Sequence, residues 1–499
     1  MSELRLFNSL TRKLERFVPR EEGRANVYTC GPTVYNYQHI GNMRAYIFAD
    51  TLGRALTSAG YDLTHVVNIT DVGHLTSDAD AGDDKMEAAA ARAGKSAWDI
   101  AAYYQGVFED DLARLNVRPV QHPKATDYVD AMVAWGRAIE PKHCYLLDSG
   151  LYFDVSTVPD YGALARAATE EGEGRIESVE GKRNAADFAI WRTTPPGETR
   201  QMEWDSPWGR GAPGWHIECS VMSAELLGHP FDIHTGGIDH REIHHPNEIA
   251  QNQAHDCTAD SGAKLWMHNN FLVDRRGKMS KSTGDFLRLQ TLVDRGFHPL
   301  AYRLMCLQAH YRSELEFTWE GLEAALTRLK RMVMAMQRVK DAAVAQHPKV
   351  PPQADGRPEL LIPPKGSTRE RTNSPKLSEM LNRFDAAVAD DLNTPIALTV
   401  LEEVLSAKKV PSVEKWYLAT DMATEVLGLP LNDMDRTDLR IRPTSAQISE
   451  TGIEAQLTRR KAARADKDFA TSDAIRDELA AKGVEVMDGD PLGWDWKLL

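Results

Sequence analysis

A short polar segment, Gln38-His39-Ile40-Gly41-Asn42, separates an apolar run from a run with helical spacing. His39 and Asn42 can donate hydrogen bonds to phosphate oxygens, and Gly41 is small enough to let a phosphate approach the backbone. The N-terminus of a helix also binds anions, because its first backbone N–H groups have no partner within the helix. The segment therefore predicts a phosphate site, although such a segment by itself is more often an ordinary turn.

A second polar segment, Lys278-Met279-Ser280-Lys281-Ser282, follows a short apolar run at 271–273 that reads as a strand. Two lysines and two hydroxyls beside a glycine suit a clamp on a polyphosphate. A solvated basic turn is the alternative for this segment taken alone.

The sequence also contains four scattered residues of the types that bind zinc: Cys30, Cys219, His244 and Glu248. Pro246 stands between the last two, and its fixed φ suits the first position of a helix. We therefore expect His244 at the start of that helix and Glu248 in its first turn, close enough to share an ion. Spacing alone leaves two alternatives open: His245 as a competing donor, and buried thiols with a surface carboxylate.

The elements around these residues predict an α/β fold. A strand at 25–29, a helix at 42–59 and a strand at 63–69 make a βαβ unit, which implies a parallel sheet of the Rossmann type. Strand signals at 231–234 and 265–273 extend the same sheet. The segment at 38–42 then lies where the first strand meets the helix that follows it.

Composition and periodicity divide the rest of the chain. The pattern changes to mixed helices and short strands after the βαβ unit, becomes helical almost throughout from about 290, and is interrupted by a Pro-rich linker. The expected boundaries are 1–115 and 205–290 for the two halves of the sheet domain, 116–204 for an inserted connective domain, 291–344 for a helical region, 345–375 for the linker, 376–445 for a helical bundle and 446–499 for the C-terminal region.

Charge and cysteine usage bound the class of protein. The five cysteines are scattered and form no CxxC pair, which argues against a disulfide framework. We see no apolar run of membrane-spanning length and no secretory leader, so we expect a cytoplasmic protein that does not bind membranes. The net charge of −14 weighs against nucleic-acid binding, but a local basic path on an acidic body remains compatible with it.

The chain resembles the bacterial cysteinyl-tRNA synthetases over nearly its whole length. The segments at 38–42 and 278–282 match, in order and separation, the paired signature motifs of class I aminoacyl-tRNA synthetases. The other matching stretches are YTCGPTVY at 28–35, NITDV at 68–72, GWHIEC at 214–219, FDIHTGGID at 231–239, HHPNEIAQ at 244–251, DLNTP at 391–395 and KDFA at 467–470. Two residues depart from the family pattern: Asn42 replaces a common histidine, and Pro246 replaces a common glutamate. Neither changes the assignment, since the Asn42 amide can still donate a hydrogen bond.

The resemblance implies a ligase that activates L-cysteine with ATP and Mg²⁺, releases pyrophosphate and transfers cysteine to the terminal adenosine of tRNA(Cys) for translation. It implies that Cys30, Cys219, His244 and Glu248 hold one Zn²⁺ per chain. That ion would bind the substrate sulfur and so distinguish cysteine from serine. A closed, purely structural zinc is the main alternative for this site. The implied roles of the remaining residues are His39, Gly41 and Asn42 at the ATP phosphates, Lys278 and Lys281 at the departing pyrophosphate, Asp239 at the substrate or ribose, and Thr70 and Trp215 in the amino-acid pocket.

For the C-terminal part, the resemblance implies contact with the tRNA stem at 291–344, anticodon binding at 446–499 and a monomeric enzyme. The basic run that begins at Arg459 would then contact the tRNA backbone. Trp494 and Trp496 either stack on unpaired anticodon bases or pack on the last helices.

Two rival functions share parts of this pattern. A ligase that activates cysteine but transfers it to a small amino sugar would have the same core motifs, but would not need the region after the linker. A non-catalytic paralogue would be expected to lose the catalytic lysine or a metal ligand, whereas Lys281, His39, Cys30 and Cys219 are all present.

Overall fold

The computed structural model describes residues 3–72, 84–165, 179–274, 287–346 and 372–498, together with the backbone of 277–278. Its central sheet has the order β10-β9-β3-β4, and each neighbouring pair is parallel. The strands are β3 (Arg24–Thr29), β4 (Asp62–Val67), β9 (Phe231–Gly237) and β10 (Ala263–Asn269). The predicted Rossmann-type parallel sheet is therefore confirmed.

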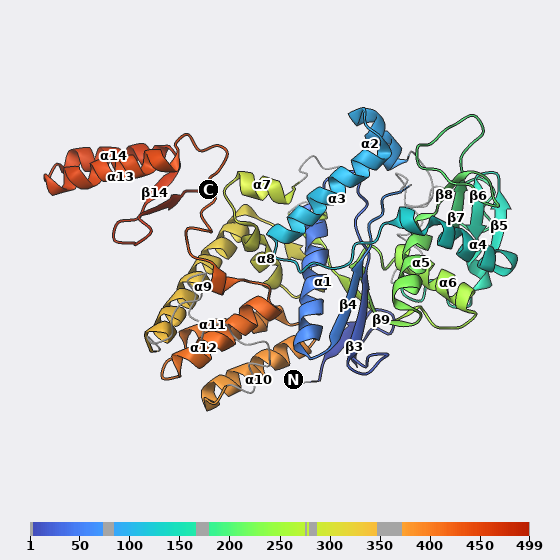
Figure 1. The fold of residues 1–499 in the computed structure, drawn as a ribbon, viewed down its shortest axis with the longest axis horizontal. Helices are drawn as coiled ribbons and strands as arrows, with labels where there is room; N and C mark the ends of the chain where they lie inside the picture. The colour runs from blue at the N-terminus through green and yellow to red at the C-terminus, as the bar shows by residue number, and fades with distance from the viewer. Residues whose placement is uncertain are drawn as a thin grey trace, which may run out of the picture.

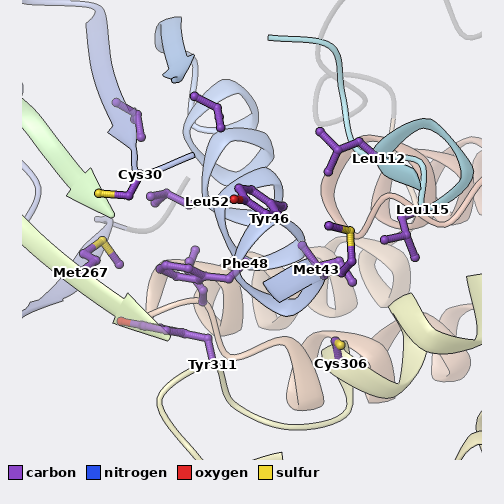
Figure 2. Close-up of a cluster of buried hydrophobic side chains, with 14 of the residues drawn as sticks. Cys30, Met43, Tyr46, Phe48, Leu52, Leu112, Leu115, Met267, Cys306 and Tyr311 are labelled. Atoms are coloured by element: carbon purple, nitrogen blue, oxygen red, sulfur yellow. The ribbon is translucent and has the colours of Figure 1, made fainter. Parts of the chain in front are cut away.

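Helix α1 (Ile40–Ser58) makes the crossover between β3 and β4 that a parallel pair requires (Figure 1). One buried side chain of this helix, Phe48, stacks on Tyr311 with ring centroids 4.4 Å apart, and the two rings lie side by side in Figure 2. The helix starts two residues earlier than its predicted start at 42, because His39 caps it. Its N-terminus therefore lies at the edge of the sheet where β3 ends.

The segment between β4 and β9 forms a second sheet, which is antiparallel and has the order β5-β6-β7-β8 (Figure 1). Its last strand lies beyond residue 204, the predicted end of the insert. The described elements here are α2 (Lys85–Ala93), α3 (Ala97–Arg114), η1 (Ala125–Tyr128), α4 (Val129–His143), β5 (Cys144–Leu147), β6 (Gly150–Phe153), η2 (Val155–Thr157), β7 (Phe188–Thr193), β8 (Gly211–Pro213) and α5 (Trp215–Leu227).

Two small sheets flank the central one. The N-terminal strands pair as a hairpin, and a three-stranded sheet carries the start of the predicted lysine segment. The hairpin consists of β1 (Arg5–Asn8) and β2 (Lys13–Arg16), and the three-stranded sheet of β11 (Leu272–Asp274), β12 (Gly277–Lys278) and β13 (Leu315–Glu316). The helices of this part of the chain are α6 (His244–Asp256), α7 (Leu289–Asp294), α8 (Pro299–Leu307) and α9 (Trp319–Gln346).

A buried ion cluster joins the helical bundle to the sheet domain. Arg303 on α8 donates to Asp50 on α1 at 2.5 Å and to the backbone oxygen of Leu427 at 2.9 Å. Both side chains are almost fully buried, so the pair fixes how α1 and the bundle pack. The bundle comprises α10 (Pro375–Ala389), α11 (Thr394–Ser406), α12 (Ser412–Thr420), a π-helical turn (Asp421–Val426) and a 3₁₀ turn (Leu431–Asp433).

The C-terminal unit has a core of its own, formed by Ile453, Ile475, Leu479, Val484, Trp494 and Trp496. Its elements are α13 (Glu450–Ala465), α14 (Phe469–Ala481), β14 (Val484–Val486) and β15 (Trp494–Trp496). The described chain is helical almost throughout after 290, as expected, and the exception in this unit is the antiparallel ladder of β14 and β15.

No described helix is long and apolar enough to cross a membrane.

Candidate active site

The first nucleotide segment forms the capped N-terminus of α1. His39 Nδ1 accepts a hydrogen bond from the Gly41 backbone N–H at 2.9 Å, and Asn42 Oδ1 accepts one from the His39 N–H at 3.2 Å. These two bonds make a reciprocal cap, which fixes both side chains. Because the Asn42 side-chain oxygen accepts this hydrogen bond, its amide Nδ2–H₂ group is the one that can donate to a bound molecule. The cap places His39, Gly41 and Asn42 around one cavity.

The second nucleotide segment lies mostly outside the described residues. The backbone of Lys278 pairs with Val273 in the short β11–β12 ladder. Lys281 lies outside the described part of the chain, so the roles of both lysines remain predictions. The described chain resumes at Leu287, which lies against the first segment because its carbonyl accepts a hydrogen bond from the Ile40 N–H at 2.9 Å.

The four predicted metal ligands come together in a buried cluster. Their donor atoms all lie within 4.8 Å of one another. Cys30 Sγ lies 4.0 Å from Cys219 Sγ, and His244 Nε2 lies 3.0 Å from Glu248 Oε1. Cys30 follows β3, Cys219 lies on α5, and α6 supplies the other two. The predicted helix position of Pro246 was wrong: it is the third residue of α6, where its missing N–H is also tolerated.

A second donor set shares two of these ligands. Cys30, His234, His245 and Glu248 also lie within 4.8 Å of one another, and Cys30 Sγ is 3.2 Å from His245 Nε2. The two sets differ in how many of their donors line the cavity. Cys30, Cys219 and His244 line the cavity that contains His39, whereas neither His234 nor His245 does. The predicted set therefore has three members at the cavity wall, whereas the second set has one, Cys30.

The histidines outside the predicted set hold its members in place. His216 Nδ1 lies 2.9 Å from His244 Nδ1, which leaves His244 Nε2 directed at Glu248. His234 Nε2 lies 2.8 Å from Glu248 Oε2. Partners of this kind orient metal ligands. We did not predict these supporting roles, although the density of histidine in 216–245 was a visible signal.

The electrostatics of the cluster suit a cation. A hydrogen bond from Cys30 lowers the pKa of Cys219 to about 6. Burial, and then the neighbouring Cys219 sulfur, raise the pKa of Cys30 well above its usual value. Burial opposes charge on Glu248, but His234 and His244 outweigh it and hold the pKa of Glu248 below its usual range. The anionic Cys219 sulfur and the Glu248 carboxylate repel one another at this distance, deprotonation of Cys30 would add to that repulsion, and a divalent ion would remove it.

For His244, burial likewise opposes the charged form. The negative charges of Glu248 and Cys219 outweigh burial and raise the pKa of His244 to about 10. The proton on this imidazole therefore acts as a counter-charge to the anionic donors. Metal binding would displace that proton, since a ligating imidazole must be neutral.

The amino-acid candidates line the same cavity, whose volume is about 300 Å³. Thr70, Trp215 and Asp239 all contribute to its walls, and the Trp215 ring lies 4.3 Å from that of His244. Thr70 Oγ1 donates to Glu218 Oε2 at 2.8 Å, and burial raises the pKa of that carboxyl. Their presence in one cavity supports the predicted roles, which remain predictions.

Close backbone packing shapes the floor of this cavity. The Gly31 N–H donates to Asn68 Oδ1 at 2.8 Å, and a Cβ at position 31 would meet the Asn68 carbonyl oxygen at 1.4 Å. Only glycine fits at this position. A larger cavity of about 530 Å³ lies along the outer edge of β4 and contains none of the predicted site residues.

The C-terminal predictions need correction. Trp494 and Trp496 are buried in the core of their unit, so stacking on bases is excluded and packing on the last helices is right. Arg460 is also buried and pairs with Asp488 at 2.6 Å, so this member of the basic run stabilises the unit. The exposed aromatic side chain in the described part of this unit is Phe469, which sequence reasoning had quoted only as part of a motif.

Two family models match the chain. Residues 16–327 match the tRNA synthetases class I (C) catalytic domain, and residues 450–491 match the cysteinyl-tRNA ligase anticodon binding domain. The first match covers more than half of the chain. It includes the nucleotide segments, the metal-compatible cluster and the inserted sheet.

Two relatives that are similar to this chain over nearly their whole length are cysteine–tRNA ligases. The chain is 65% identical to the cysteine–tRNA ligase of Novosphingobium aromaticivorans, over 99% of this chain and 97% of that one. It is 53% identical to the cysteine–tRNA ligase of Zymomonas mobilis, over 98% and 97%. Among solved structures, Mycobacterium tuberculosis methionyl-tRNA synthetase bound by methionyl-adenylate shares the fold, with a TM-score of 0.54, 14% identity, and coverage of 81% of this chain and 92% of that one.

Proposed function

We propose, from the premise that this chain belongs to the cysteine–tRNA ligase family, that it selects cysteine with a zinc ion held by Cys30, Cys219, His244 and Glu248. The chain acts as an ATP-dependent aminoacyl-tRNA synthetase that attaches cysteine to tRNA(Cys). One observation carries the zinc proposal: three of the four donors line the cavity that also receives the N-terminus of α1.

The donor set fits zinc and gives it a function. Two sulfurs, an imidazole and a carboxylate are a zinc set, and their repulsion favours a divalent ion. When bound, the ion supplies a soft Lewis acid that a substrate thiolate ligates far better than a hydroxyl does. Shape alone would separate cysteine from serine by only about 1–3 kcal/mol.

Activation of cysteine takes place at the N-terminus of α1. The substrate carboxylate oxygen attacks the α-phosphorus of ATP, and the bond from that phosphorus to the β-phosphate oxygen breaks, which releases pyrophosphate. His39 and the Asn42 side-chain amide stabilise the charge that develops on the α-phosphate. Lys278 and Lys281 neutralise pyrophosphate, and Mg²⁺ accompanies ATP. Asp239, at the cavity wall, contacts the ribose or substrate.

The amino-acid end of the cavity orients the substrate. Thr70 donates its hydroxyl proton to Glu218, so toward a molecule in the cavity its oxygen can only accept a hydrogen bond. Trp215 packs against His244 and shields the metal side from water. In the second step a ribose hydroxyl of the terminal adenosine attacks the activated carbonyl, and AMP leaves.

The C-terminal unit recognises the tRNA anticodon loop. Residues 450–491 match an anticodon-binding model, and Phe469 is 63% exposed at the start of α14. An exposed aromatic ring can stack on an unpaired base, and the partly exposed Arg464 nearby in the chain can contact phosphate. Because one chain carries both the catalytic cavity and this unit, we propose a monomer that works in the cytoplasm, where translation takes place.

The decisive test is cysteine-dependent ATP–pyrophosphate exchange, with serine in parallel and the metal content of the same sample. We expect exchange with cysteine only and about one zinc ion per chain. A folded, zinc-loaded protein without exchange would overturn the proposal. Transfer to a small amino sugar instead of tRNA(Cys), under the same conditions, would favour the rival ligase.

A further inference from the structure

Three tyrosines and two cations form a cluster beside the cavity, here called the aromatic rim: Tyr37, Tyr103, Tyr104, Lys95 and Arg288. The Tyr37 and Tyr103 hydroxyls are 3.1 Å apart, and the rings of Tyr37 and Tyr104 meet edge to face at 5.0 Å. The Arg288 guanidinium lies over the Tyr37 ring at 4.2 Å, and Lys95 Nζ lies 5.7 Å from the centre of the Tyr103 ring.

The aromatic rim exposes apolar surface that needs an explanation. The Tyr103 side chain is 49% exposed, which places it among the six most exposed large apolar side chains of the described residues. Tyr37, Tyr104 and Arg288 are partly buried, and Lys95 is exposed. Isolated exposed side chains are ordinary, but an exposed cluster of rings with cations above them is the kind of surface that binds a partner.

The position of the aromatic rim links it to the active site. Tyr37 directly precedes Gln38 and His39, which both line the cavity. Arg288 directly follows Leu287, whose carbonyl accepts from the first residue of α1. Helix α3, which carries Tyr103 and Tyr104, therefore lies beside the segment that leads from the cavity wall into the N-terminus of α1.

The chemistry of the aromatic rim suits single-stranded nucleic acid. Tyrosine rings stack on unpaired bases whatever their sequence, and Lys95 and Arg288 supply positive charge for the phosphates between them. A base-paired stem keeps its base faces covered and is too wide for a cavity of about 300 Å³. Only an unpaired end can both stack here and reach the activated amino acid.

We propose that the aromatic rim binds the unpaired 3′ nucleotides next to the terminal adenosine of the tRNA and guides that adenosine into the cavity. This inference rests on the proposed function. Stacking on Tyr103 fixes the path of the strand, while the cations hold its backbone. The rim therefore acts in transfer and tRNA binding, and activation of cysteine does not depend on it.

The test compares intact tRNA(Cys) with the same transcript lacking its last three nucleotides, at one fixed salt concentration. The wild-type protein should bind the intact tRNA more tightly. Tyr103→Ala should lose most of that preference, by about five- to a hundredfold, which is the stacking of one base. Tyr103→Phe keeps the ring and should keep the preference. Leu146→Ala removes an equally exposed apolar side chain from the inserted sheet and should also keep it.

A second measurement covers the case in which Tyr103→Ala does not fold. A fluorescent base analogue at the penultimate nucleotide should be quenched when tRNA binds the wild-type protein, and equally so with Tyr103→Phe, which keeps the ring. Equal preference for intact and truncated tRNA, or an unquenched analogue, would overturn the inference. Absence of cysteine-dependent exchange in the wild type would instead overturn the proposed function.

Discussion

Cys30 Sγ and Cys219 Sγ lie 4.0 Å apart in the fold, although 189 positions separate them in the chain. The end of β3 supplies one sulfur and α5 the other. This relationship places two soft donors at the wall of the same cavity that contains His39.

Replacing Cys219 by serine should abolish the metal-based selection. A hydroxyl in place of the sulfur binds zinc weakly, so zinc content should fall well below about one ion per chain. Cysteine-dependent exchange should fall by at least about a hundredfold. Metal analysis and exchange on the same preparation check both. Cys257→Ser, which changes a cysteine outside the cluster, should leave both unchanged, and full activity of zinc-free Cys219→Ser protein would contradict the proposal.

His234 should matter through Glu248. Its Nε2 contacts Glu248 Oε2 at 2.8 Å, so His234→Leu removes a partner of the carboxylate that we propose binds zinc. Zinc affinity, measured by competition with a chelator, should fall about 10- to 100-fold. His234→Gln can keep a donor near the Nε2 position and should lose much less. Equal affinities for both variants would mean that this contact does not support the ligand.

His39 has two functions that substitution can separate. Asparagine is a strong helix cap, so His39→Asn should keep the thermal midpoint while lowering exchange about a hundredfold through loss of the phosphate contact. His39→Ala should lose the cap as well, which costs about 1 kcal/mol of stability. If His39→Asn exchanges at the wild-type rate, the histidine serves only as a cap.

Burial of His65 should make the folded protein less stable in mild acid. Burial lowers its pKa from 6.5 to about 4. Between these two pH values the imidazole is protonated in the unfolded chain but neutral in the folded protein. The stability is present above about pH 6.5 and is lost as the pH falls toward 4, by about 2 kcal/mol between pH 7.5 and 5. His65→Gln should make urea unfolding less sensitive to pH over this interval. An unchanged pH dependence would contradict the assignment.

Phe469 and Trp494 should behave oppositely. Phe469 is 63% exposed, so Phe469→Ala should change stability little and weaken binding of an anticodon stem-loop by about 1–3 kcal/mol. Trp494 is 1% exposed, so Trp494→Ala should destabilise the C-terminal unit by about 3–5 kcal/mol. Thermal unfolding and stem-loop titration separate the two effects. Unaltered stem-loop binding by Phe469→Ala would exclude it from the interface.

The chemistry of the site could be predicted from the sequence because it depends on residue types. Thiols, imidazole and carboxylate are residue types that can bind zinc, and the segment at 38–42 predicts a helix start that can bind phosphate. The parallel sheet followed in the same way from strand, helix and strand periodicity. The helix start and the strand periodicity are local signals, whereas the four donors are scattered along the chain and only the family resemblance grouped them.

Tertiary structure alone decided which residues face which. His244 and His245 are adjacent on α6 and therefore point about 100° apart, so only the packing of that helix brings the first of them to the cavity wall. Trp494 and Trp496 could have been exposed, but pairing of β15 with β14 turns them onto α13 and α14. Support of Glu248 by His234 and the Tyr37–Tyr103 contact likewise join distant segments. Such contacts depend on how helices and strands pack together, which no local pattern specifies.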